Sequence, residues 1–247
     1  MRNNLRYQLI LFSSFDLNTS QEVLNAIKTA LNDDRMNVTP FIETIFGINP
    51  GGPTNVGRPR FASTDGTYSF YVKSDCLAFE WVNVDIEVTP LLSFDAFCKK
   101  SIDICKRVKY FAEHYYRRIG LVRTTFIDEV DQQKVFDYLC RPIKYYEGKE
   151  MKDWNCFLPA KTFIDGGKIE VNATSRIQHL TTRVNRLSSN QLFDGISITS
   201  DVNTLASNNQ DKYSVTDIEH LLCEMKDVEY QITNDYCNVI NNDSNRS

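Results

Sequence analysis

The chain has 247 residues, of which 42% are hydrophobic and 24% are charged, and its formal net charge is -4. This length and composition allow a hydrophobic core without disulfides and exclude wholesale disorder, and no apolar run is long enough to span a membrane. The acidic balance gives no overall attraction to nucleic acid. The seven cysteines are scattered without a CxxC pair, so we expect a reducing, cytoplasmic compartment.

The first third of the chain is predicted to be a strand, a helix and then extended segments. Residues 5–15 are strand-like, and Ser20 followed by Glu22 predicts the start of a helix with an apolar stripe. Residues 41–48 are predicted to be extended. Residues 48–60 contain three prolines and three glycines, which predicts an irregular loop. Residues 67–73 and 77–88 then predict a hairpin, because polar and apolar residues alternate in its second strand.

The middle and end of the chain repeat this pattern of strands followed by an amphipathic helix. Ser93 precedes a predicted helix, residues 115–128 form a predicted strand, and residues 131–140 a short helix. Asp165-Gly166-Gly167 predicts a turn between strands at 162–164 and 168–173, and further strands are expected at 180–187 and 192–202. Ser214 and Asp217 form a capping box for a final helix.

These elements predict an α+β protein made of two antiparallel-sheet subdomains, each covered by an amphipathic helix. The first subdomain is expected to span residues 1–140 and the second residues 141–240, because 141–155 has the composition of a connector. Residues 241–247 are expected to be a disordered tail.

A family resemblance rests on a short motif and on the C-terminal region. Arg118-Ile119-Gly120-Leu121 matches the start of an "RIGLRYIN"-like strand, and DGISITSD (194–201) leads into the final helix. The chain thus resembles a sporadically distributed prokaryotic family of about this length and of unknown function. The chain departs from the pattern in two ways. Arg123 stands where an aromatic residue is preferred, and the polar Asn that follows in the pattern is absent. The resemblance implies an accessory role beside another protein, as in defence modules, and brings no catalytic residues.

Three arginines and a histidine around the 115–128 strand are the first candidates for an anion site. Guanidinium groups grip phosphate through paired hydrogen bonds, and His114 is placed to act as acid or base. Strand alternation sets Arg117 and Arg123 on one face, about 20 Å apart, and Arg118 on the other, so they cannot share one phosphate. The alternative is that Arg118 pairs with a carboxylate on a neighbouring strand, such as Asp85 or Glu87, while Arg117 faces water.

Arg58 and Arg60 are the second candidates, because a glycine-rich loop with two arginines can follow an extended anion such as a nucleic-acid backbone. The segment lacks the GxxxxGK[ST] order of a phosphate loop. A plain connector is the alternative. As a long exposed loop, residues 48–60 are nevertheless the predicted partner-binding element.

Metal-ligating residues show no short ligand spacing, and the three histidines lie far apart in the sequence. The nearest approach is His220 and Cys223 with Glu219 or Glu224. Because Cys223 adjoins the apolar stripe of the final helix, we interpret it as a core thiol. We therefore predict no metal and no cofactor.

The functional prediction is a non-catalytic interaction or regulatory protein that binds a protein partner through exposed aromatic residues and residues 48–60. We expect an accessory subunit of a prokaryotic defence or toxin-neutralising module, with no membrane association and with homo-oligomerisation as a further option. One alternative is a nucleic-acid-binding module that uses the arginines named above. The other is a metal-dependent nuclease built on Asp165, Lys168 and Glu170, although no acid, base and nucleophile stand out together.

Overall fold

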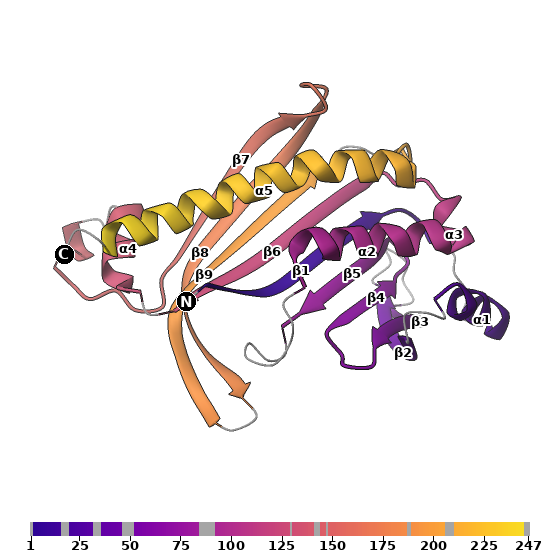
Figure 1. Cartoon of the computed structure of the whole chain (residues 1–247), viewed down its shortest axis with the longest axis horizontal. Coiled ribbons are helices and arrows are strands. Elements are labelled where there is room, and N and C mark those ends of the chain that lie inside the picture. Colours follow the sequence, from indigo (N-terminus) through magenta and orange to yellow (C-terminus); the bar gives the residue numbers. More distant parts are fainter. Residues whose placement is uncertain are drawn as a thin grey trace.

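The computed structural model describes residues 2–15, 20–31, 36–45, 52–83, 92–128, 130–140, 144–146, 148–186, 189–205 and 210–244. Within them, nine strands form a single antiparallel sheet in the order β2-β3-β4-β5-β1-β6-β9-β8-β7. The long helices lie side by side over one face of this sheet (Figure 1). The predicted α+β class is therefore confirmed, as two layers.

The strands and helices have the following bounds. The strands are β1 (Arg2–Phe12), β2 (Met36–Ile45), β3 (Thr54–Ser63), β4 (Tyr68–Val72), β5 (Cys76–Val82), β6 (Arg118–Asp128), β7 (Asn155–Ile164), β8 (Ile169–Arg186) and β9 (Ser189–Thr204). The helices are α1 (Gln21–Ala30), α2 (Phe94–Arg107), α3 (Lys109–Ala112), α4 (Gln132–Leu139) and α5 (Val215–Ser244), with a 3-10 turn η2 (Lys144–Tyr146). The predicted hairpin of residues 67–88 corresponds to β4 and β5, and its last residues, 84–88, lie outside the described part.

The helix starts follow the capping residues that the sequence indicates. Ser20 and Ser93 accept hydrogen bonds from the backbone N–H groups three residues later, which are among the unpaired donors of a helix N-terminus. Asp131 caps α4 in the same way. Before α5, the Asp217 N–H donates to Ser214 Oγ, and the Ser214 N–H donates to the Asp217 carboxylate. All four predicted helices are confirmed.

The predicted loop at residues 48–60 is wrong from Thr54 onward, where the chain is strand β3. Pro59 lies directly opposite Pro40 in the pairing of β3 with β2. Neither proline has an N–H, so the two can occupy a pair of the ladder that exchanges no hydrogen bonds. The next strand, β4, pairs with β3 only from Arg60 onward. Residues 48–51 lie outside the described part of the chain.

The two predicted sheets are one continuous sheet. β1 pairs with β5 and with β6, and β6 pairs in turn with β9, so strands of both halves share one hydrogen-bonded layer. The main core also mixes the halves, because Val171 and Val202 belong to the same buried cluster as Tyr7 and Leu9. Of the expected tail, residues 241–244 continue α5, and residues 245–247 lie outside the described part.

The predicted turn at Asp165-Gly166-Gly167 is confirmed between β7 and β8. All three residues have positive φ angles, of 52°, 61° and 90°, a backbone that the two glycines adopt without steric cost. At the other end, β8 and β9 continue as a two-stranded arm beyond the pairing of Leu180 with Gly195. The arm projects away from the body of the molecule (Figure 1).

Candidate binding groove

Arg58 and Arg60 lie on β3, and both side chains are held by neighbouring groups. Arg58 is buried and forms an ion pair with Glu43, with 2.8 Å between Nε and Oε2. Glu43 also accepts hydrogen bonds from Ser74, and these bonds together with Arg58 outweigh burial and lower the pKa of the Glu43 carboxyl. The Arg60 guanidinium lies 5.3 Å from the centre of the Tyr71 ring. This placement argues against an exposed anion-binding loop at these residues.

The other three arginines face different surroundings. Arg123 is buried beneath α5, where its Nη1 lies 3.0 Å from Glu229 Oε2. Arg118 lies on the opposite face of the sheet, with its guanidinium 4.7 Å from the centre of the Phe12 ring and its Nε donating to the Thr204 carbonyl. The expected partners of Arg118 are residues 85 and 87, and both lie outside the described part of the chain. Arg117 Nη1 donates to Ser14 Oγ at 3.4 Å.

His114 packs among aromatic rings and contacts a buried serine. Its ring stacks on Phe15 with 4.6 Å between centroids, and burial lowers the pKa of the imidazole. Ser13 Oγ lies 2.8 Å from His114 Nε2 and donates its proton to the Tyr115 carbonyl. The Ser13 hydroxyl is therefore shared between a backbone carbonyl and an imidazole nitrogen, and the tautomer of His114 sets the direction of the second hydrogen bond. The predicted arginines and His114 are therefore not brought together into one anion site.

The edge strand β7 is the most exposed apolar element in the described chain. Phe157, Leu158 and Phe163 are 54%, 50% and 61% exposed, and they lie on both faces of the strand. β7 pairs with β8 on one side, and no described strand pairs with its other side. Edge strands with apolar side chains invite pairing with another chain. The opposite edge of the sheet is β2, and within this strand Ile42 is the only large hydrophobic side chain that is exposed.

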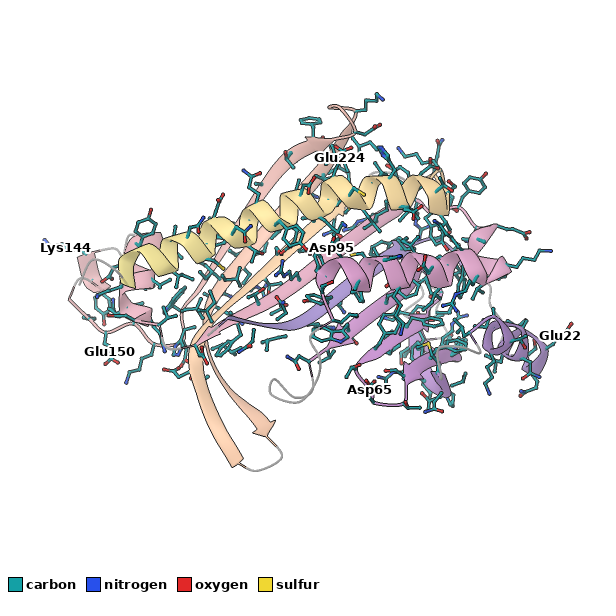
Figure 2. All side chains as sticks on the ribbon, viewed as in Figure 1. Glu22, Asp65, Asp95, Lys144, Glu150 and Glu224 are labelled. Carbon is teal, nitrogen blue, oxygen red and sulfur yellow. The ribbon has the colours of Figure 1, made fainter. Side chains whose placement is uncertain are left out.

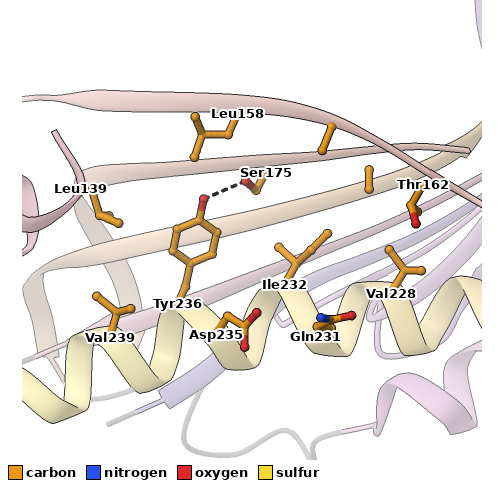
Figure 3. A pocket seen from close by; sticks show the side chains of 12 residues that line it. Leu139, Leu158, Thr162, Ser175, Val228, Gln231, Ile232, Asp235, Tyr236 and Val239 are labelled. Atoms are coloured by element: carbon orange, nitrogen blue, oxygen red, sulfur yellow. Dashed lines mark hydrogen bonds between the residues drawn. The ribbon is translucent and has the colours of Figure 1, made fainter.

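A groove of about 410 Å³ separates β7 and β8 from α5 (Figure 3). Its sheet side is lined by short side chains, among them Ala160, Ala173 and Ser175, which leave room beneath the helix. Val228, Ile232 and Tyr236 point into it from α5 (Figure 3). Val228 and Ile232 continue the apolar stripe of the predicted helix, but the same stripe is buried at Ile218 and Met225. The groove is thus the part of the α5 stripe that the sheet leaves uncovered.

The lining of the groove fits binding rather than chemistry. A hydrogen bond of 2.8 Å between Tyr236 Oη and Ser175 Oγ crosses the groove (Figure 3), and burial raises the pKa of the tyrosine hydroxyl. Among the described lining residues, Asp235 is the only carboxylate, and none is a histidine, cysteine, lysine or arginine. An acid, a base and a nucleophile are therefore not combined in this lining.

The prediction of a connector at residues 141–155 and of a strand that begins only at residue 162 misses most of β7. The segment NCFLPAKTFI has apolar residues at both odd and even positions and a central Pro159, a combination typical of an edge strand. Cys223, interpreted as a core thiol, is exposed on α5. The interpretation was wrong because the position lies at the margin of the apolar stripe, beside the buried Leu222.

Searches against protein-family models, curated proteins and solved structures found no match. In the described part of the chain, no helix has both the length and the apolar character needed to cross a membrane. The groove and the edge strand therefore carry the functional argument by themselves.

Proposed function

We propose that this chain is a non-catalytic interaction protein that holds an extended apolar segment of a partner protein along β7 and beneath α5. The observation that carries the proposal is the continuity of the exposed apolar edge strand with the groove at the same end of the sheet. An added strand gains main-chain hydrogen bonds from a sheet edge, and pockets for alternate side chains select its sequence.

A segment of a different protein fits this edge better than a second copy of the chain. Two copies pairing antiparallel through the middle of β7 would bring Pro159 of each copy close to the other. Each proline lacks an N–H, so such a sheet would lose ladder hydrogen bonds on both strands. A partner with its own sequence meets only one proline. Pro159 also protects the edge against unselective pairing.

Charge further defines the partner segment. Asp227, Gln231 and Asp235 recur every fourth residue on α5, and Gln231 and Asp235 line the groove. Both aspartates are exposed. We therefore propose a segment whose apolar residues are flanked by lysine or arginine, and binding that weakens as salt screens these charges.

The experiment compares variants of the two edges of the sheet. The tagged full chain is purified from its native host to identify a partner that binds in stoichiometric amounts. The affinity of that partner is then measured for the wild type and for Leu158→Asp. A charge at this half-exposed position of the groove should weaken binding by roughly tenfold or more, because the apolar side chains that the partner places here would bury the carboxylate. Ile42→Ser, on β2 at the far edge, should bind as the wild type does.

Hydrogen exchange on the purified complex locates the contact. Protection of the β7 amides and of the neighbouring face of α5 is the expected result. Protection confined to β2 or to the β8–β9 arm, or equal binding by Leu158→Asp and Ile42→Ser, would show that the groove is not the contact site. Light scattering of the protein alone gives its mass, and a dimer broken by Leu158→Asp would favour self-association instead.

The wider role follows from the resemblance described above. We propose an accessory subunit of a prokaryotic defence or toxin-neutralising module, supported by the match at residues 118–121. Purifying the product of a neighbouring gene together with this chain tests that role. A partner unrelated to such modules would count against it while leaving the groove proposal intact.

A further inference from the structure

A histidine and two carboxylates converge where the β7–β8 turn meets α5. Asp165 is the first residue of the turn, and His220 and Glu224 lie one helical turn apart on α5. One ligand atom from each of these three side chains lies within 4.8 Å of the other two. Figure 2 labels Glu224 on α5, close to the end of the hairpin. Three potential metal ligands from sequence-distant segments therefore meet.

The contacts around this cluster hold two of the ligands in place. The Asp165 N–H donates to Glu224 Oε2 at 2.8 Å, which joins the turn to the helix. Lys168 Nζ lies 3.5 Å from Asp165 Oδ2, and its side chain is 76% exposed. A bound cation would replace this lysine as the counter-charge at little cost, because exposed ion pairs contribute little to stability. A metal ion could therefore take the place of the Lys168 ammonium group beside Asp165.

An open cavity of about 540 Å³ adjoins the cluster and is lined by Asp165 and His220. Three protein ligands beside open space leave coordination positions for water or another ligand, unlike a closed four-ligand site. One imidazole nitrogen with two carboxylate oxygens suits zinc and its first-row neighbours better than calcium or magnesium, which prefer oxygen ligands throughout. We propose that Asp165, His220 and Glu224 bind one divalent transition-metal ion of the zinc class.

This proposal departs from the expectation of no metal, and it does not rest on the proposed partner binding. In the sequence, Asp165 and His220 belong to separate hypotheses, the first with Lys168 and Glu170 and the second with Cys223. In the structure, Glu170 pairs with Lys161 at 2.7 Å, and Cys223 Sγ donates to the Glu219 carbonyl. The fold instead joins Asp165 to a helix that begins 50 residues later.

Cobalt serves as the probe, because its absorption distinguishes nitrogen and oxygen ligands from thiolates. The full chain is stripped with a chelator, dialysed and titrated with Co²⁺ under reducing conditions. The expected result is saturation at one ion per chain, without a thiolate charge-transfer band. His220→Ala and Glu224→Gln should each weaken binding by roughly tenfold or more, since each removes a ligand. Asp227→Asn, an exposed carboxylate one turn further along α5, should leave the affinity within about twofold.

Three outcomes would overturn the metal proposal. They are non-saturable binding, equal affinity of His220→Ala and the wild type, and a thiolate band that places the ion on cysteines such as Cys140 and Cys156. Circular dichroism confirms that each variant is folded, and His220 is exposed, so its loss should not disturb the core.

Discussion

Arg123 and Glu229 place opposite charges between the sheet and α5, and Glu229 is 0% exposed. Arg123 Nε and Nη2 each donate to Asn4 Oδ1 at 3.1 Å. Glu229 Oε1 accepts from Ser200 at 2.7 Å and from Thr233 at 2.5 Å. Buried charges are tolerated when their hydrogen-bonding capacity is filled in this way, so the pair fixes where α5 sits on the sheet.

Removing only one of these charges should destabilise the protein strongly. We expect Arg123→Met to lower the free energy of unfolding by about 3–5 kcal/mol, because Glu229 would stay buried without a counter-charge. Urea denaturation measures this loss. The double variant Arg123→Met with Glu229→Gln should recover a large part of it, since the glutamine keeps a carbonyl acceptor for Ser200 and Thr233.

The matched control is the exposed ion pair between Lys106 and Glu219, which joins α2 to α5 at 2.7 Å. Lys106→Met should cost less than about 1 kcal/mol, because solvent screens this pair. Similar losses for Lys106→Met and Arg123→Met would contradict the role assigned to burial.

At the scale of elements, the contact between β6 and β9 joins the two halves of the sheet. Gly195 of β9 lies opposite Asp128 of β6. A β-carbon at residue 195 would lie 2.8 Å from Phe126 Cζ and closer still to the Ile127 carbonyl oxygen. The two strands approach so closely at this point that only glycine fits.

Gly195→Ala should therefore lower the free energy of unfolding by about 1–3 kcal/mol, the usual cost of overpacking. Gly57→Ala on β3 is the control, because a β-carbon there meets no atom within 4 Å, and its effect should stay within about 0.5 kcal/mol. Chemical denaturation of both variants checks the difference. Equal effects would mean that the β6–β9 contact relaxes around the added methyl group.

The predictions from sequence succeeded where the physical cause is local. A capping serine such as Ser93 bonds a backbone group three residues away, and the Asp165 turn is set by two glycines, so both can be read from short segments. Strand β3 could not be predicted in this way. Its prolines and glycines favour a loop until the pairing of Pro59 with Pro40 is known, and that pairing depends on the register of the whole sheet.

The candidate groove was predictable in part. The apolar stripe of α5, including Val228 and Ile232, follows from helical spacing alone. Which part of that stripe stays uncovered depends on the small residues Ala160 and Ala173, which come from two other strands. The burial of Arg123 could not be predicted for the same reason, because its counter-charge lies 106 residues away in the chain. Local sequence patterns carry no information about such long-range contacts.

At the scale of the molecule, one sheet carries two buried clusters on its helix-covered face. The larger cluster contains Trp81 and combines residues of both halves. The smaller contains Trp154 and gathers Val135 and Phe136 of α4 with Ile240 from the end of α5. On the opposite face, side chains such as Gln8, Val122 and Thr124 are partly exposed. The two clusters share β6, β8, β9 and α5, so neither half has a sheet or a core of its own.

This architecture predicts that the chain unfolds in a single transition, although its sequence suggested a boundary near residue 141. The two tryptophans make the test direct, because each lies in a different cluster and the chain has only these two. In Trp154→Phe, fluorescence reports on the larger cluster, and in Trp81→Phe on the smaller one. Circular dichroism of the same variant gives the unfolding midpoint of the secondary structure of the whole chain. The fluorescence and dichroism midpoints should coincide within each variant, which is the criterion for two-state unfolding. If the smaller cluster melts first in Trp81→Phe while most of the secondary structure persists, the end of α5 and α4 form a separate unit. The division at residue 141 would then describe how the protein folds, despite the shared sheet.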